Sequence, residues 1–168
     1  MSMTLYDAAV PIFVQQLQAM KVVLEKALAH ATVRKIQPEV LLNARLFPDM
    51  LPLVRQVQIT TDFAKGATAR LAGREVPKWE DTEKTFEELQ TRLDRAIAFV
   101  QTVPAAEIIG QEGRAITLLA GGQTLNFLGQ SYLLGFVLPN LFFHAATAYA
   151  ILRHSGVELG KRDFLGQF

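Results

Sequence analysis

The residues best spaced for chemistry lie in two otherwise apolar stretches. Asn140 and His144 are four residues apart near the C-terminus, and Gln58 and Asp62 are four apart in the first half of the chain. In a helix, residues four apart lie about 40° from each other around the axis and one turn apart along it. Each pair can therefore direct two side chains toward one point between packed helices.

Together these residues offer the ligand types of a divalent metal ion. Asp62, His144 and Asn140 would supply a carboxylate, an imidazole and an amide, which with water make a weak divalent site. Gln58 would line the same pocket. The alternative is that His144 and Asn140 are hydrogen-bonded polar groups of a buried helix. His154 lies about 15 Å farther along the helix than His144, so it cannot join the site.

Composition excludes several classes of protein. The chain has 168 residues, half of them apolar, with 17 basic and 16 acidic residues that leave a net charge of +1. That size and hydrophobicity predict one folded domain over residues 1–168, and the balanced charge argues against a nucleic-acid partner. The absence of cysteine excludes disulfides, a cysteine nucleophile and a thiolate metal site, and it favours a reducing compartment. With no basic segment before the first apolar residues, we expect a cytoplasmic protein.

Apolar residues at three- and four-residue steps predict four helices, over about 7–31, 48–71, 81–103 and 129–154. Two short alternating runs around Gly121-Gly122 predict a β-hairpin before the last helix. The charged side of the third helix, which includes Arg92, is expected to face solvent. The fold class is therefore all-α, an antiparallel four-helix bundle with a small β-hairpin before the last helix.

The last predicted helix is the most apolar part of the chain, because no charged residue occurs from Ala115 to Leu152. It is long enough to cross a membrane. Pro139, Asn140 and His144 would be costly in hydrocarbon, so we predict instead the innermost helix of a bundle, with no membrane partner. Pro139 should bend this helix, because proline removes one helical hydrogen bond.

The segment NLFFHAATAYAILRHSG, residues 140–156, resembles the last helix of the DinB/YfiT-like superfamily of four-helix bundles. In that family two histidines four apart precede an aliphatic stretch and a glycine. His144 matches the second histidine, Asn140 stands in place of the first, and the family's remaining histidine corresponds to Gln58 or Asp62. The pieces ARLFPDMLPLVRQVQITTDFAKGATARLAG, TFEELQTRL and YAILRHSGVELGKRDFLG resemble one bacterial-type branch known as a domain of unknown function.

The resemblance implies three hypotheses about function. The first is a bundle that binds a small molecule in an inter-helix pocket beside His144, Asn140, Gln58 and Asp62, with a degenerate metal site. The second is a thiol transferase or isomerase that depends on a divalent metal such as zinc or nickel, which would lower the pKa of a thiol cosubstrate. The third is a non-enzymatic structural or interaction protein. A homodimer is expected, because exposed apolar faces commonly mark contacts and two-fold pairs are the commonest oligomers.

Overall fold

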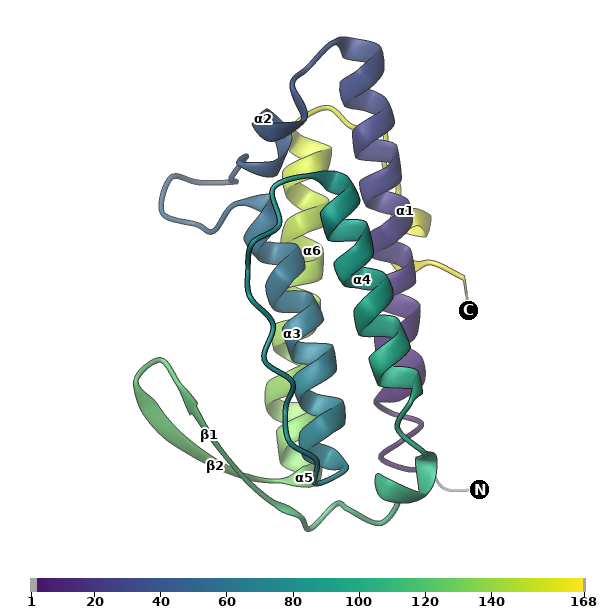
Figure 1. Ribbon diagram of the computed structural model, residues 1–168, viewed down its shortest axis with the longest axis vertical. Helices are drawn as coiled ribbons and strands as arrows, with labels where there is room; N and C mark the ends of the chain where they lie inside the picture. Colours follow the sequence, from purple (N-terminus) through teal and green to yellow (C-terminus); the bar gives the residue numbers. More distant parts are fainter. Residues whose placement is uncertain (1–2, 168) are drawn as a thin grey trace.

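The computed structural model of the protein describes residues 3–167 and has the expected bundle, formed by four long helices. Figure 1 shows them side by side along the long axis of the molecule. Their bounds are α1 Val10–Arg34, α3 Leu53–Leu71, α4 Phe86–Gln101 and α6 Leu138–His154. Each turns an apolar side inward, and the core runs the length of the bundle, with Phe13, Leu24, Leu53, Leu93 and Leu141 fully buried.

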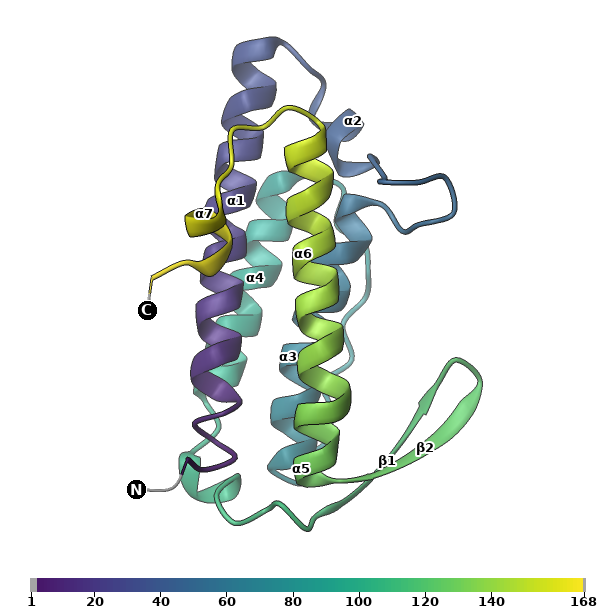
Figure 2. The ribbon, with the colours of Figure 1, turned by 180° about the vertical axis from the view of Figure 1, so that it is seen from behind.

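The order of the helices has one feature that the sequence analysis did not predict. α3 and α4 run in the same direction, because residues 72–85 form a long connection that returns along α3 before α4 begins (Figure 1). The closest helix pairs are α3 with α6 and α1 with α4, and both pairs are antiparallel (Figures 1 and 2). The long connection therefore covers the seam between α3 and α4.

Local signals explain where the helices begin. α1 has Pro11 in its first turn, where a missing N–H costs nothing. α3 begins only after Pro52, later than the spacing predicts. α4 begins after Thr85, whose side chain accepts from the backbone of Glu88 while the Glu88 carboxylate accepts from the backbone of Thr85, a reciprocal capping box. We expected Asp81 or Thr82 to be this cap, and the capping box corrects that prediction.

The expected hairpin is present as β1 Ala115–Ala120 and β2 Gln123–Leu128, paired antiparallel. Gly121 and Gly122 form its turn with φ of 57° and 77°. Two positive φ values are typical of the tight turn that matches the twist of paired strands. Figures 1 and 2 show the hairpin standing away from the bundle on one side, and the segment 43–52 after the short helix α2 (Pro38–Leu42) projects on that same side.

The structure shows a π-helical segment before Pro139, within the continuous helical stretch Gly129–His154, where we expected a bend. α5 (Gly129–Ser131) leads into a π-helical segment, η2 (Tyr132–Val137), and α6 follows with Pro139 in its first turn. π-Helical turns of this kind are commonly found where the regular hydrogen-bond pattern of a helix is interrupted. Asn140 lies just after this turn and donates from Nδ2 to the Phe136 carbonyl at 2.7 Å.

The segment Gly129–His154 is the one described helical stretch that is long and apolar enough to cross a membrane, and 33% of its most apolar window is buried. The prediction of an innermost helix is therefore wrong in one respect. α6 packs on α3 and α1 but leaves an outer side exposed, including Phe142 and Phe143. A four-helix bundle has no central helix, so even a charge-free helix keeps one side toward the surroundings.

The chain after α6 returns to the bundle. α7 (Lys161–Leu165) lies against α1, with the Phe164 ring on Tyr149 of α6 and Gln15 Nε2 donating to the Leu165 carbonyl. We expected the rings of Phe164 and Phe168 to dock either on the bundle or on a second subunit, and Phe164 packs on the bundle. Phe168 lies outside the described residues.

Candidate functional site

His144 lies half-buried at the seam where α6 packs on α3, and its polar partner is Gln56. The Nδ1 atom of His144 is 2.7 Å from Gln56 Oε1. Gln56 is 2% exposed and donates from Nε2 to the Leu51 carbonyl at 3.0 Å. Because that carbonyl can only accept, Oε1 is the end of the Gln56 amide that faces the imidazole. Nδ1 of His144 must therefore carry the proton that this bond needs.

The second nitrogen of His144 is left free by this arrangement. Nε2 makes no hydrogen bond to a residue within 3–167, and it is not among the buried polar atoms without a partner, so it remains open to solvent. Burial lowers the pKa of His144 below its ordinary value. At neutral pH the imidazole is therefore neutral, and Nε2 presents a lone pair that accepts a hydrogen bond.

Aromatic rings surround this imidazole. Phe63 of α3 stacks on His144 at 6.0 Å between ring centroids, and Phe143 meets it edge-on at 5.2 Å. Phe63 also contacts Phe136, which in turn contacts Phe127 of the hairpin at 5.2 Å. The rings thus form a continuous apolar chain from His144 to the base of the hairpin. Small-molecule sites commonly combine a few polar groups with apolar walls in a cleft, whereas the hollows found in the described part of the chain are lined by other residues than His144 and Phe63.

Gln58 and Asp62, the two predicted partners on α3, lie on a different side of that helix. Asp62 Oδ1 accepts from Lys65 Nζ at 2.7 Å and from Arg92 Nη2 at 3.1 Å. Gln58 donates to Glu83 at 2.7 Å. Both side chains therefore belong to the seam between α3 and α4, and the structure does not bring them to His144.

The seam between α3 and α4 is an ion-paired network centred on Arg92. This guanidinium is 3% exposed, which corrects the expectation that Arg92 faces solvent. Its other N–H groups reach Thr61, the Glu80 carbonyl, Glu83 and Asp81. Burial raises the pKa of the Asp81 carboxyl, but its bond to Arg55 and the charges of Arg55 and Arg92 lower that pKa more, so the net shift is downward. Every N–H of the Arg92 side chain has an acceptor, so this network is already complete.

The residues present do not fit the divalent metal that the family resemblance implies. His144 offers one nitrogen, Nε2, that could bind a metal ion. The Asp62 carboxylate is occupied by two cations, and the Asn140 side chain is bonded within its own helix. Among residues 3–167, no group of three or more His, Cys, Asp or Glu side chains could hold a metal ion. Metal ions of the first transition row are held by several such ligands, so we derive no chemistry through a metal here.

Gln56 is the functional residue that the sequence analysis missed. It belongs with Thr60 and Phe63 to a stripe at four- and three-residue steps, which is as regular as the stripe that we chose. The spacing of residues in a helix defines its sides but does not say which neighbouring helix covers each side. Gln56 is buried only because α6 covers this side of α3, so the sequence held no separate signal for it.

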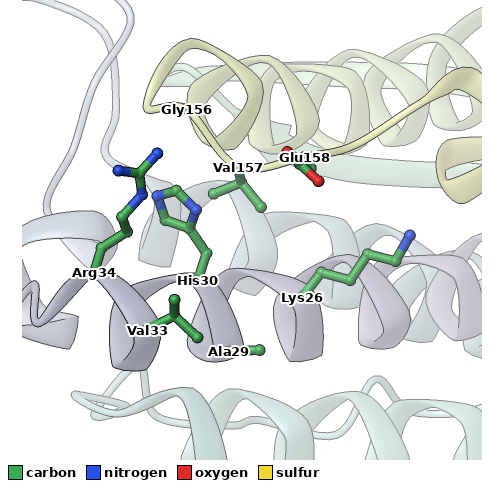
Figure 3. Close-up of a pocket in the computed structure, with 8 residues that line it drawn as sticks. All are labelled: Lys26, Ala29, His30, Val33, Arg34, Gly156, Val157 and Glu158. Carbon is green, nitrogen blue, oxygen red and sulfur yellow. The ribbon is translucent and has the colours of Figure 1, made fainter.

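A hollow of about 470 Å³ lies away from His144, between the C-terminal part of α1 and the chain after α6 (Figure 3). Lys26, His30 and Arg34 line one wall, and the other includes Glu158. α1 and α6 both end here, and the negative ends of two helix dipoles attract basic side chains. Lys26 also pairs with Asp163 at 2.6 Å. The end of α1 therefore accounts for His30 and Arg34, and the ion pair with Asp163 accounts for Lys26.

Comparisons with known proteins support the fold over the whole chain. The family model described as "Domain of unknown function (DUF1993)" matches residues 5–165. The chain is also similar to a solved structure described as a DinB family member protein from Shewanella denitrificans. That match has 38% identity and a TM-score of 0.88, and it covers 98% of this chain and 93% of the other. A comparison with curated proteins gives no match.

Proposed function

Because the chain belongs to the DUF1993 family, a DinB-like family of unknown function, we propose that it is a binding protein for a small molecule. The ligand would contact Nε2 of His144 at the seam between α3 and α6. The observation that carries this proposal is the pair of hydrogen bonds from Leu51 through Gln56 to His144. A second polar residue that fixes one tautomer is a feature of imidazoles held ready for a ligand.

The chemistry of the site defines the class of ligand. A neutral imidazole with Nδ1–H already used presents only an acceptor, so the ligand should bring a donor such as a hydroxyl or an amide N–H. Phe63 and Phe143 would contact its apolar or aromatic body. Among residues 3–167, burial alone and no neighbouring charge shifts the pKa of His144, and a neutral ligand is therefore favoured.

Phenol and anisole test this proposal, because they share a ring and only phenol can donate a hydrogen bond. We expect the wild-type protein to bind phenol about five-fold more tightly than anisole, which is the effect of one hydrogen bond of about 1 kcal/mol. Nuclear magnetic resonance titration, followed on the His144 ring signals, measures both affinities. Equal affinity for the two probes, or no change at His144, would contradict the proposal.

Two variants make the test specific. His144→Phe keeps an aromatic ring at the seam but removes Nε2, so the preference for phenol should fall to about one-fold. His154→Phe is the matched control, because it changes the exposed histidine at the end of the same helix. The control should retain the wild-type preference, and its loss in both variants would assign the effect to something other than Nε2.

A further inference from the structure

A second hollow, which we call the basic hollow, has cations on its walls that no acid of the chain pairs with. It has a volume of about 410 Å³ and lies between α3 and the connection 72–85, which runs along that helix (Figure 1). Three basic side chains line it, Lys65, Arg70 and Lys78, beside the single carboxylate of Asp62. We propose that the basic hollow binds the phosphate group of a small phosphorylated molecule.

The guanidinium of Arg70 has one pair of donors free. Its Nη1 atom donates to the Tyr132 hydroxyl at 3.1 Å. Nε and Nη2 make no hydrogen bond within the described part of the chain, and neither is among the buried polar atoms without a partner, so solvent reaches both. Arg74 shows what this edge of a guanidinium binds, because its Nε and Nη2 each donate at 2.6 Å to an oxygen of Glu107 in η1 (Ala105–Glu107). The same edge of Arg70 is therefore free for two oxygens of an anion.

A glycine inside α3 provides the space for this guanidinium. Gly66 lies in the interior of the helix, where glycine is destabilising relative to alanine. A Cβ at residue 66 would lie 2.7 Å from Arg70 Nη1, which is too close, but 3.9 Å from Val76, which is an ordinary contact. The missing Cβ is therefore needed by the guanidinium and not by the connection. The dipole of α3 also attracts a cation to the last turn, but that attraction does not require glycine at this position.

The charges around the basic hollow favour a doubly negative group. Lys65 is buried, and its Nζ is 2.7 Å from Asp62 Oδ1, so the carboxylate compensates this cation. Arg70 and Lys78 lie outside the Arg92 network, and neither has an ion pair within the described residues. A phosphate monoester carries about two negative charges near pH 7. It can match both cations, whereas a carboxylate can match only one.

The size of the basic hollow indicates that the phosphate is attached to an organic body. Its volume of about 410 Å³ is more than a bare phosphate ion fills and is within the range of small-molecule sites, about 300 to 1,000 Å³. Val76, Pro77 and Trp79 form the apolar part of its lining. Lys65 and Arg95 hold the Trp79 ring, at 4.4 and 4.3 Å from its centroid. This part of the lining can contact the carbon skeleton of the ligand.

The fluorescence of Trp79, the only tryptophan of the chain, reports binding in the basic hollow directly. Propyl phosphate is the probe, and propyl sulfate is its control, because it has a similar shape but one negative charge. At low salt we expect propyl phosphate to bind about ten-fold more tightly than propyl sulfate, and more tightly than inorganic phosphate. No fluorescence change with propyl phosphate, or equal affinity for propyl sulfate, overturns the proposal. Equal affinity for inorganic phosphate overturns the organic body.

An arginine pair locates the anion. Arg70→Gln should weaken the binding of propyl phosphate about ten-fold, because it removes the free pair of donors. Arg45→Gln is the matched control, since Arg45 also gives a hydrogen bond to an uncharged acceptor, the Met50 carbonyl, but lies in the projecting segment 43–52. The control should bind like the wild type. Equal weakening in both variants would mean a general attraction by net charge and overturns the site.

Gly66→Ala tests the site even if Arg70→Gln fails to fold. The added methyl group displaces the guanidinium but removes no charge, so we expect about three-fold weaker binding of propyl phosphate. Because alanine favours a helix, the variant should unfold at a urea concentration no lower than the wild type does. Full affinity in Gly66→Ala overturns the proposal. The preference for phenol at His144 should be the same in this variant and the wild type, so the two proposed sites fail or stand independently.

Discussion

The two sides of α3 bury polar side chains in opposite ways. On the α4 side, Arg92 is surrounded by acceptors, and its positive charge is paired with the carboxylates of Asp62, Asp81 and Glu83. On the α6 side, the polar groups are neutral, and the chain of hydrogen bonds ends at an unpaired nitrogen of His144. A complete network has no bond left for a ligand. The incomplete one leaves an acceptor, which is why we place function on the α6 side.

The largest expected effect concerns the complete network. Arg92→Met removes the cation but keeps the aliphatic part of the side chain, and it leaves three carboxylates without their shared partner. Loss of one partner from a buried ion network costs about 3 kcal/mol, here at the low end because the carboxylates are partly exposed. Urea unfolding measures this change in the free energy of unfolding.

Arg95→Met is the control for that measurement. Both guanidinium groups lie over the Trp79 ring, Arg92 at 5.9 Å and Arg95 at 4.3 Å from its centroid, but Arg95 is on the exposed side of α4. Its loss should cost less than about 1 kcal/mol. Similar costs for Arg92→Met and Arg95→Met would mean that the network on the α4 side does not hold the connection 72–85 in place.

The two sides should also respond to acid in different pH ranges. Burial lowers the pKa of His144, so the unfolded chain binds a proton more readily than the folded one. The contribution of the neutral ring is fully present above the unfolded pKa of about 6.5 and is lost as pH falls from there toward the folded pKa. Because the ring is half-exposed, the loss should be less than about 1 kcal/mol.

The α4 side loses stability only in stronger acid, because the pKa of Asp81 lies below its ordinary value. Urea unfolding at a series of pH values separates the two ranges. His144→Phe should remove the change below about pH 6.5 and leave the stronger acid transition intact, while His154→Phe should alter neither. An unchanged profile in His144→Phe would show that this imidazole is not held neutral by the fold.

The same contrast explains how far the sequence could lead. Helical spacing and the Gly121-Gly122 turn were sufficient for the bundle and the hairpin, because these depend on local patterns. The four-residue spacing of Asn140 and His144 in an apolar helix and the family resemblance both pointed to His144. The partners of His144 depend on which side of α3 meets α6, and a repeat of 3.6 residues does not contain that information. Arg92 was misjudged for a related reason: the acceptors that bury it include residues of the connection 72–85, which has no periodic pattern.

The smallest expected effect joins the two sides in one measurement. A site built from Asp62, Asn140 and His144 would require the α4 side to give up its carboxylate to the α6 side. The ion pairs of Asp62 with Lys65 and Arg92 oppose that exchange. We therefore expect the dissociation constant for zinc or nickel to be no lower than the metal concentration in the assay. Binding at that level stabilises by about 0.4 kcal/mol, which raises the melting temperature by about 1 °C.

A rise of about 5 °C that disappears in both His144→Phe and Asp62→Asn would instead show that one ion draws the two sides together. Such a rise in wild type that survives Asp62→Asn would place the metal at His144 alone and leave the separation of the two sides intact.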